Sequence, residues 1–292
     1  MLTSYNFDIV HLEATDVCQA ACPQCGREVE RDFDKTAHNH LSVDQIKNIL
    51  DIDTIKNLKK MFMCGNYGDP AAGKHTLDIY QYFREINPGI TLGMNTNGGI
   101  GTTNWWGNLG TMLNRPEDYV IFSIDGLQDT NHLYRRNVVW DKVIENARAF
   151  ISAGGQAHWE MLLFDYNEHQ LEEVKSLAQS MGFKFFNTKV SRRFKYYPVV
   201  GINPPTGYVN EEIGKKIECH AIKENSVYIS ARGILHPCCW LGYKNGKELA
   251  EFDNIKQSWS TATPYSTCLQ SCSIIDDTSN FTKQWRNRIK IF

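Results

Sequence analysis

The sequence lacks a long apolar run, a basic N-terminal segment and an excess of charge of either sign. No apolar stretch reaches the ~18 residues of a membrane-spanning helix, and residues 1–8 have neither the basic nor the apolar region of a signal peptide. The formal net charge of −2 gives no electrostatic reason to expect nucleic-acid binding. The nine cysteines lie in clusters and not in the framework of a small secreted domain, which favours metal binding in a reducing compartment. We therefore expect a soluble, cytoplasmic protein.

Three of these cysteines lie within eight residues, in the order Cys18-x3-Cys22-x2-Cys25. Thiolates at this density favour zinc or an iron–sulfur cluster. A structural zinc site needs four ligands, and the next cysteine, Cys64, is more simply interpreted as a buried strand residue. A four-iron cluster held by three cysteines leaves one iron open for a substrate or cofactor. The alternative is a zinc knuckle with a distant fourth ligand.

The rest of the chain alternates short apolar strands with amphipathic helices. A capping box of Ser42 and Gln45 starts one helix, and Asn167 with Gln170 is expected to cap another, whereas residues 27–40 are interpreted as a polar loop. Six strand–helix units predict an α/β fold with a parallel sheet, a partial (β/α)6 TIM-like barrel. Strands are expected at 7–12, 61–64, 90–94, 119–124, 158–164 and 183–187, and helices at 42–59, 76–86, around Trp105 and Trp106, at 138–153 and at 167–181.

Four unusual segments each follow one of the first four strands. They are the cysteine loop, GNYGDP at 65–70, NTNG at 95–98 and SIDG at 123–126. Because the carboxyl ends of parallel strands share one face, where ligands bind, we expect these segments to meet around a single site. A zinc knuckle alone does not account for that coincidence.

In this setting the cysteine motif resembles that of the radical S-adenosylmethionine (SAM) superfamily, although Gln24 stands where that family often has an aromatic residue. The resemblance implies a [4Fe–4S] cluster on Cys18, Cys22 and Cys25, whose open iron chelates SAM. Residues 65–70 resemble the Gly-Gly-Glu-Pro stretch that binds the SAM amino group, with an aspartate for the glutamate, and the next two segments resemble those flanking the SAM ribose and carboxylate. The residues implied in SAM binding are Gly65, Asn66, Tyr67, Asp69, Asn95, Asn97, Ser123, Asp125 and Arg136.

Within this set the family spacing favours Arg136 over Arg135 as the partner of the SAM carboxylate. The resemblance also suggests that Glu160, Asn167 and His169, on or after the fifth strand, complete the lining of the SAM site.

The other cysteine group is C-terminal, and the pattern of residues 227–237 within it predicts a hairpin with a three-residue turn and a left-handed glycine at Gly233. The arrangement resembles the SPASM domain and its shortened twitch form, which hold auxiliary iron–sulfur clusters. We expect a partial barrel at 1–200, a linker at 201–210 and a twitch-type domain at 211–292. Cys239 is an alternative to Cys238, and a four-thiolate zinc site is an alternative to the cluster. Four ligands would suffice for a second [4Fe–4S] cluster: Cys219, Cys238, Cys268 and Cys272.

The resemblance implies a radical SAM oxidoreductase. An external reductant such as flavodoxin or ferredoxin would supply an electron, SAM would be cleaved to a 5′-deoxyadenosyl radical, and that radical would take hydrogen from a substrate C–H bond. The auxiliary cluster would accept an electron from the substrate radical, or it would instead ligate the substrate; four cysteine ligands favour electron transfer. The substrate is a peptide, a protein or a polar metabolite, and the early start of the first strand lowers the case for a peptide. Two alternatives are a zinc-stabilised binding protein on a degenerate barrel and an iron–sulfur electron carrier without SAM chemistry.

Overall fold

The sheet at the centre of the structure is an open, mostly parallel barrel. Its strand order in the described part of the chain is β11-β6-β5-β4-β3-β2-β1-β8-β9, with β1 to β6 paired in parallel and in sequence order. The computed structural model describes residues 6–30, 33–36, 38–191, 193–194, 196–209, 214, 216–274 and 289–290. The six parallel strands are β1 (Ile9–Leu12), β2 (Lys60–Met63), β3 (Thr91–Thr96), β4 (Tyr119–Ser123), β5 (Ala157–Leu163) and β6 (Phe185–Val190).

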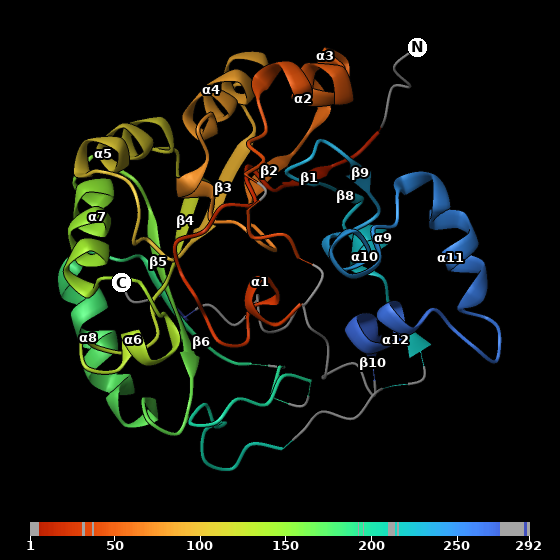
Figure 1. The fold of residues 1–292 in the computed structure, drawn as a ribbon. Coiled ribbons are helices and arrows are strands. Elements are labelled where there is room, and N and C mark those ends of the chain that lie inside the picture. Colours follow the sequence, from red (N-terminus) through yellow and green to blue (C-terminus); the bar gives the residue numbers. More distant parts are fainter. Residues whose placement is uncertain are drawn as a thin grey trace.

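Helices cover the outer face of this sheet, as Figure 1 shows for α4, α5, α7 and α8. The ring of Phe122 in β4 packs against Trp106 and Phe150 of two outer helices, so the residue that follows it, Ser123, belongs to the opposite, concave face. The helices of this part are α2 (Val43–Ile49), α3 (Ile52–Asn57), α4 (Thr76–Ile86), α5 (Thr103–Met112), α6 (Asn131–Tyr134), α7 (Trp140–Ser152) and α8 (Leu171–Met181), with short turns η1 (Pro70–Ala72) and η2 (Glu168–Gln170).

The C-terminal hairpin extends the same sheet. Strand β8 (Ser226–Ile229) pairs in parallel with β1, β9 (Leu235–His236) pairs antiparallel with β8, and β11 (Ile289–Lys290) pairs with β6 at the other edge. The predicted turn is confirmed, because Ser230 N donates to the Ile234 carbonyl and Gly233 has φ +75°. Strand β8 covers an edge of β1 that would otherwise be open, so the barrel and the C-terminal region share one sheet.

Beside the hairpin, α10, α11 and α12 contribute Leu241, Ile255 and Cys268 to a small second core. Figure 1 shows them beside β8 and β9. No helix in the described part of the chain is long and apolar enough to cross a membrane. The elements are α9 (His220–Lys223), α10 (Cys239–Asn245), η3 (Leu249–Glu251), α11 (Phe252–Ser258) and α12 (Ser266–Cys272), with a two-stranded sheet of β7 (Lys216–Ile217) and β10 (Ser273–Ile274).

Three local predictions need correction. The helix predicted over 42–59 is two helices, because Leu50 is extended and Asp51 starts α3 by accepting from Thr54 N, although the capping box of α2 forms as predicted. The loop predicted over 27–40 begins with a helical turn, α1 (Gly26–Val29). Asn167 does not cap α8: its side-chain oxygen accepts from Phe164 N, and Gln170 is the N-cap.

Candidate functional site

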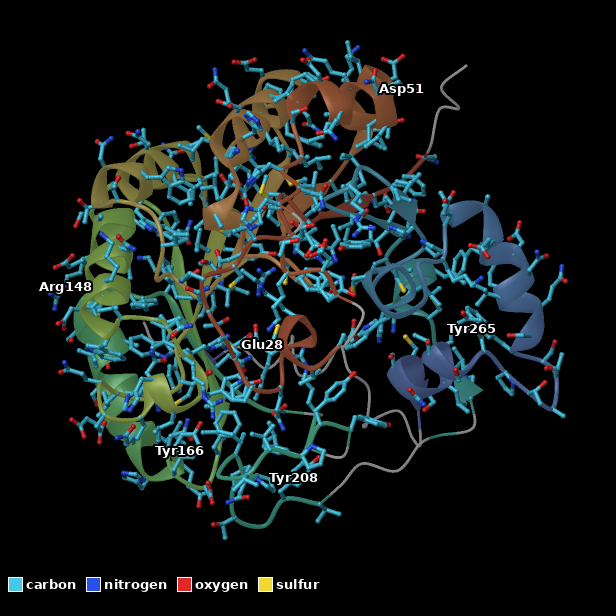
Figure 2. All side chains as sticks on the ribbon, in the orientation of Figure 1. Glu28, Asp51, Arg148, Tyr166, Tyr208 and Tyr265 are labelled. Carbon is cyan, nitrogen blue, oxygen red and sulfur yellow. The ribbon has the colours of Figure 1, made fainter. Side chains whose placement is uncertain are left out.

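The cysteine loop lies on the concave side of the sheet, between β1 and α1. Cys25 is the N-cap residue of α1, and Figure 2 shows Glu28 of this turn near the centre of the concave side, whereas Arg148 of α7 projects from the outer surface. Burial raises the pKa of the Cys18 thiol, and the nearby Cys22 and Cys25 thiols raise it further. Three thiols are thus close enough to oppose one another's ionisation, which a cationic metal centre would relieve.

The end of β3 contacts the first cysteine of the loop. Asn97 Nδ2 lies 3.6 Å from Cys18 Sγ, and Gln19 Nε2 donates to Asn97 Oδ1 at 2.7 Å. The NTNG segment and the cysteine loop are therefore joined directly. Asn97 is buried, so its amide is fixed in this position.

The end of β4 contacts the second cysteine through Arg135. Arg135 Nε donates to Asp125 Oδ2 at 2.7 Å, and its Nη1 lies 3.9 Å from Cys22 Sγ. Burial raises the pKa of Cys22 to about 11 although the Arg135 charge opposes the rise. The side chain of Arg136 is exposed, and its backbone carbonyl accepts from Ala21 N at 3.0 Å. After α6 it is therefore the side chain of Arg135 that turns toward the cysteine loop. The contact of Arg136 with the SAM carboxylate stays a prediction from the sequence.

Asp69 joins the loop after β2 to the end of β3. One carboxylate oxygen accepts from Ala71 N at 3.0 Å and from Thr96 Oγ1 at 2.8 Å, and the other accepts from Asn97 N at 2.7 Å. Burial raises the pKa of this carboxyl, and the three hydrogen bonds oppose the rise. Both oxygens are engaged within the protein, so Asp69 holds the strand ends in register.

Glu13, which the sequence analysis did not single out, ties β1 to the same loop. Its Oε1 accepts from Tyr67 N at 2.7 Å and Gly68 N at 3.2 Å, and the Tyr228 hydroxyl of β8 donates to Oε2. Burial raises the pKa of this carboxyl. The sequence does contain a signal for Glu13, because a charged residue between a buried strand and the cysteine motif needs partners inside the fold.

Gly68 lies directly against the cysteine loop. A side chain at this position would overlap the carbonyl oxygen of Thr15, so only glycine allows the two loops to pack. Gly65 is restricted in the same way by the backbone of Gly68. These two glycines therefore serve a close approach between backbones, as the loop's sequence suggests.

The other predicted residues of this loop contact neighbouring segments. Asn66 Nδ2 donates to the Cys239 carbonyl at 3.2 Å. The Tyr67 hydroxyl donates to Glu30 Oε2 at 2.9 Å, and its ring stacks on Phe33 with centroids 4.1 Å apart. They link the loop to α10 and to the segment after α1.

The remaining predicted residues lie on or after β3, β4 and β5, and all but one of them are at least partly buried. Asn95 and Ser123 are partly buried at the ends of β3 and β4, and Glu160 of β5 forms an ion pair with Lys189 of β6 at 2.5 Å. Asn167 is buried and donates to the Asp125 carbonyl at 3.0 Å. The side chain of His169 is exposed, so the structure does not bring it into the site.

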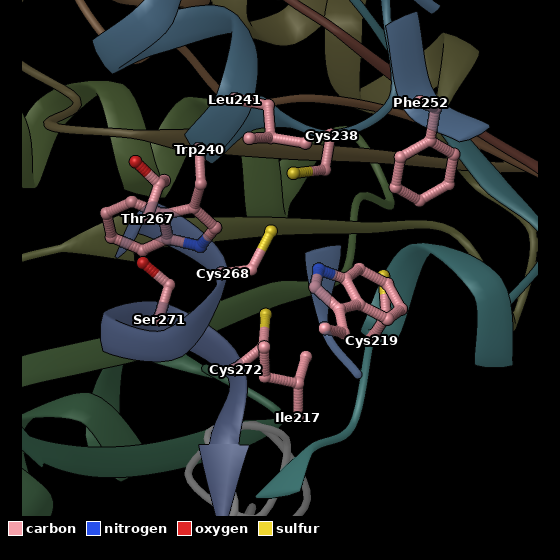
Figure 3. A pocket seen from close by; sticks show the side chains of 11 residues that line it. Ile217, Cys219, Cys238, Trp240, Leu241, Phe252, Thr267, Cys268, Ser271 and Cys272 are labelled. Atoms are coloured by element: carbon pink, nitrogen blue, oxygen red, sulfur yellow. The ribbon is translucent and has the colours of Figure 1, made fainter. Parts of the chain in front are cut away.

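A second group of cysteines surrounds a cavity in the C-terminal region. Figure 3 shows Cys219, Cys238, Cys268 and Cys272 around it, between aromatic side chains that include Trp240 and Phe252. Cys239 does not line this cavity, so the geometry favours Cys238 of the two neighbours. Among the described residues, no three histidine, cysteine or acidic side chains converge closely enough to hold one metal ion.

No model of a known protein family matches the chain, and no curated protein matches its sequence. Solved structures do match it. SuiB from Streptococcus suis, bound to the precursor peptide SuiA, superposes with a TM-score of 0.60 at 14% identity, over 91% of this chain and 67% of SuiB. The anSMEcpe structure with bound AdoMet (SAM) superposes with a TM-score of 0.59 at 12% identity, over 95% of this chain and 91% of that one. The chain has the radical SAM fold.

In this radical SAM fold the two cysteine groups differ in their surroundings. An arginine–aspartate pair and an asparagine amide stand beside the barrel group, whereas the described residues that line the C-terminal cavity include no charged side chain. Burial raises the pKa of Cys238 and of Cys272 to about 12, and the neighbouring cysteines add to both shifts. Both groups suit a cluster that takes thiolate ligands and offsets their charge.

Proposed function

We propose that the protein is a radical SAM enzyme in which Cys18, Cys22 and Cys25 bind a [4Fe–4S] cluster. The observation that carries the proposal is that separate strand ends contact this loop: Asn97 from β3 reaches Cys18, and Arg135, paired with the end of β4, reaches Cys22. A zinc knuckle does not require such an arrangement. The fold shared with SuiB and anSMEcpe supports the same function.

When bound, such a cluster supplies the electron that cleaves SAM into methionine and a 5′-deoxyadenosyl radical. The chain's own residues bind and orient the reactants. Arg135 offsets negative charge beside Cys22, and the Asn97 amide faces Cys18. We assign Asp69 to positioning, since its oxygens already accept three hydrogen bonds, and the backbone of the glycine-rich loop to contact with the SAM ammonium group.

The four C-terminal cysteines are proposed to hold a second [4Fe–4S] cluster that accepts an electron from the substrate radical. The observation that supports a cluster is that the four cysteines stand around one cavity. Structural zinc places four ligands on a single ion at about 2.3 Å each, whereas a four-iron cluster spreads its ligands over four irons.

For the substrate, peptides are the first class to test. The SuiB structure contains the precursor peptide SuiA, and an anSMEcpe structure contains the Cp18Cys peptide. A small reductant protein such as flavodoxin or ferredoxin is proposed as the electron source. Transfer of deuterium from a labelled peptide into 5′-deoxyadenosine would identify both the substrate and the abstracted position.

The decisive experiment is anaerobic reconstitution followed by assay of 5′-deoxyadenosine under dithionite. We expect the Cys18→Ala/Cys22→Ala/Cys25→Ala variant to form none and to retain about half of the iron, because two four-iron clusters hold about eight irons. Cys64→Ala is the matched control, since this cysteine lies in the same barrel at the end of β2 and is not a proposed ligand; it should retain SAM cleavage. Product formation by the triple variant would refute the assignment.

A further inference from the structure

The cavity in the C-terminal region is lined by four cysteines and by two indoles, those of Trp240 and Trp259. Cys219 and Cys238 are the N-cap residues of α9 and α10, and neither side chain accepts a capping hydrogen bond. The indole N–H groups belong to the same lining as the sulfurs.

Trp259 brings a buried donor to this lining. Its indole Nε1–H is buried and has no hydrogen-bond partner among the described residues. Trp259 lines the same cavity as Cys268 and packs in the same small core, which places the indole beside this sulfur. A buried N–H without an acceptor is costly, and a thiolate that carries a metal charge is a better acceptor than a thiol.

The position of Trp259 is fixed by packing. Its ring meets Phe252 edge-on, with centroids 6.2 Å apart and planes at 72°, and its backbone N–H donates to the Lys256 carbonyl at 3.1 Å. The indole belongs to the same small core as Leu241 and Cys268. Packing thus holds the indole in the lining of the cavity.

Resting on the proposed second cluster, we propose that Trp259 sets its reduction potential by donating the indole N–H to the Cys268 ligand. One-electron reduction adds negative charge to a centre that already carries four thiolates, and among the described residues no charged side chain lines the cavity. A donor to a ligand sulfur stabilises the reduced state more than the oxidised state, and so raises the potential. Trp259 is a positioning residue for the acceptor role of this cluster.

The test uses the full chain carrying Cys18→Ala/Cys22→Ala/Cys25→Ala, so that only the C-terminal cluster contributes to the spectrum. The oxidised and reduced forms are titrated with dithionite and mediators and followed by electron paramagnetic resonance. With Trp259→Phe we expect the reduced-to-oxidised ratio at a fixed potential to fall about threefold, at the low end of the net worth of one hydrogen bond. At 59 mV per tenfold for one electron, that is a midpoint about 30 mV more negative.

The matched control is Phe252→Leu, which alters the ring packed against Trp259 and leaves the N–H in place. The midpoint potential of its C-terminal cluster should equal that of the chain that carries only the three cysteine substitutions. If Trp259→Phe binds no iron, site-specific 5-fluorotryptophan at position 259 decides, because it keeps the ring's shape and makes the N–H a stronger donor; the midpoint should then move to a more positive value.

An unchanged midpoint in an iron-loaded Trp259→Phe or fluorotryptophan protein would overturn the role of Trp259, as would an equal shift in Phe252→Leu. A parent variant without iron, or with zinc, would instead overturn the second cluster and this inference with it. SAM cleavage by the wild-type chain reports on the barrel cluster independently.

Discussion

Asp69 gives the sharpest test of how the strand ends are held together. The sequence suggests that Asp69→Ala mainly weakens SAM binding, since an aspartate in a plain turn contributes little to stability. The structure changes that expectation, because removal of the carboxylate leaves the donors of Ala71, Thr96 and Asn97 without their acceptor in a buried region. We therefore expect a large loss of stability in addition to weaker SAM binding.

The expected loss of stability in Asp69→Ala follows from the three donors that lose their acceptor. A buried donor left without an acceptor costs about 1–3 kcal/mol. The low end applies here, since removal of a buried carboxylate also relieves its desolvation, so the total is about 3 kcal/mol. For a chain of this size each 1 kcal/mol lowers the melting temperature by roughly 2–4 °C, which gives a decrease of roughly 6–12 °C.

The measurement is an anaerobic thermal melt of the reconstituted protein, paired with SAM titration. Asp78→Ala is the control, because Asp78 is an exposed aspartate on α4 whose Oδ2 lies 3.5 Å from His75 Nδ1; its melting temperature should not change. Asp69→Asn keeps one acceptor oxygen and should fall between the wild type and Asp69→Ala. A melting temperature of Asp69→Ala within about 2 °C of the wild type would refute the hydrogen-bond reasoning.

The remaining predictions concern the loops and one helix cap. Gly68→Ala should lower iron incorporation into the barrel cluster, since its Cβ would overlap the Thr15 backbone, whereas Gly107→Ala on α5, where a Cβ meets nothing within 4 Å, should retain full iron. Arg135→Met should reduce iron retention and SAM cleavage, and Arg136→Met should leave both unchanged, as measured by iron content and 5′-deoxyadenosine; equal losses would contradict the geometry. Hydrogen bonds from Thr54 lower the pKa of Asp51, so its stabilisation is present above the ordinary carboxyl pKa and is lost as the pH falls through the folded-state value. Melts of Asp51→Asn should therefore show a weaker loss of stability in acid than wild type.

Periodicity predicted most of the parallel barrel because each strand and helix carries its own pattern. The helix at 76–86 has the bounds of α4, and the six predicted strands correspond to β1 to β6. Local periodicity does not indicate which residues far apart in the sequence are in contact. The break at Leu50 depends on Asp51 as a second cap, and helical periodicity continues across it.

The candidate site shows the same difference between local patterns, which the sequence reveals, and long-range contacts, which it does not. Spacing predicted the cysteine loop and the loops that face it, because the order of strands fixes which ends are neighbours. It did not predict Glu13 or Arg135, whose roles depend on side-chain direction and on partners such as Tyr228, 215 residues away in the sequence. The sequence likewise suggested Asp69 for SAM binding and showed no sign of its structural role, since its partner Asn97 lies 28 residues along the chain.

These long-range contacts connect the two proposed cluster sites. The glycine-rich loop donates two backbone N–H groups to Glu13, and Glu13 also accepts from Tyr228 of β8. Asn66 of the same loop donates to the carbonyl of Cys239, the residue after Cys238. Because β8 pairs with β1 in the register Val10 to Val227, the loop proposed to bind SAM and the hairpin that leads to Cys238 are held by one sheet. The distance between the two sites is therefore fixed by the fold, as electron transfer between a substrate in the barrel and a second cluster requires.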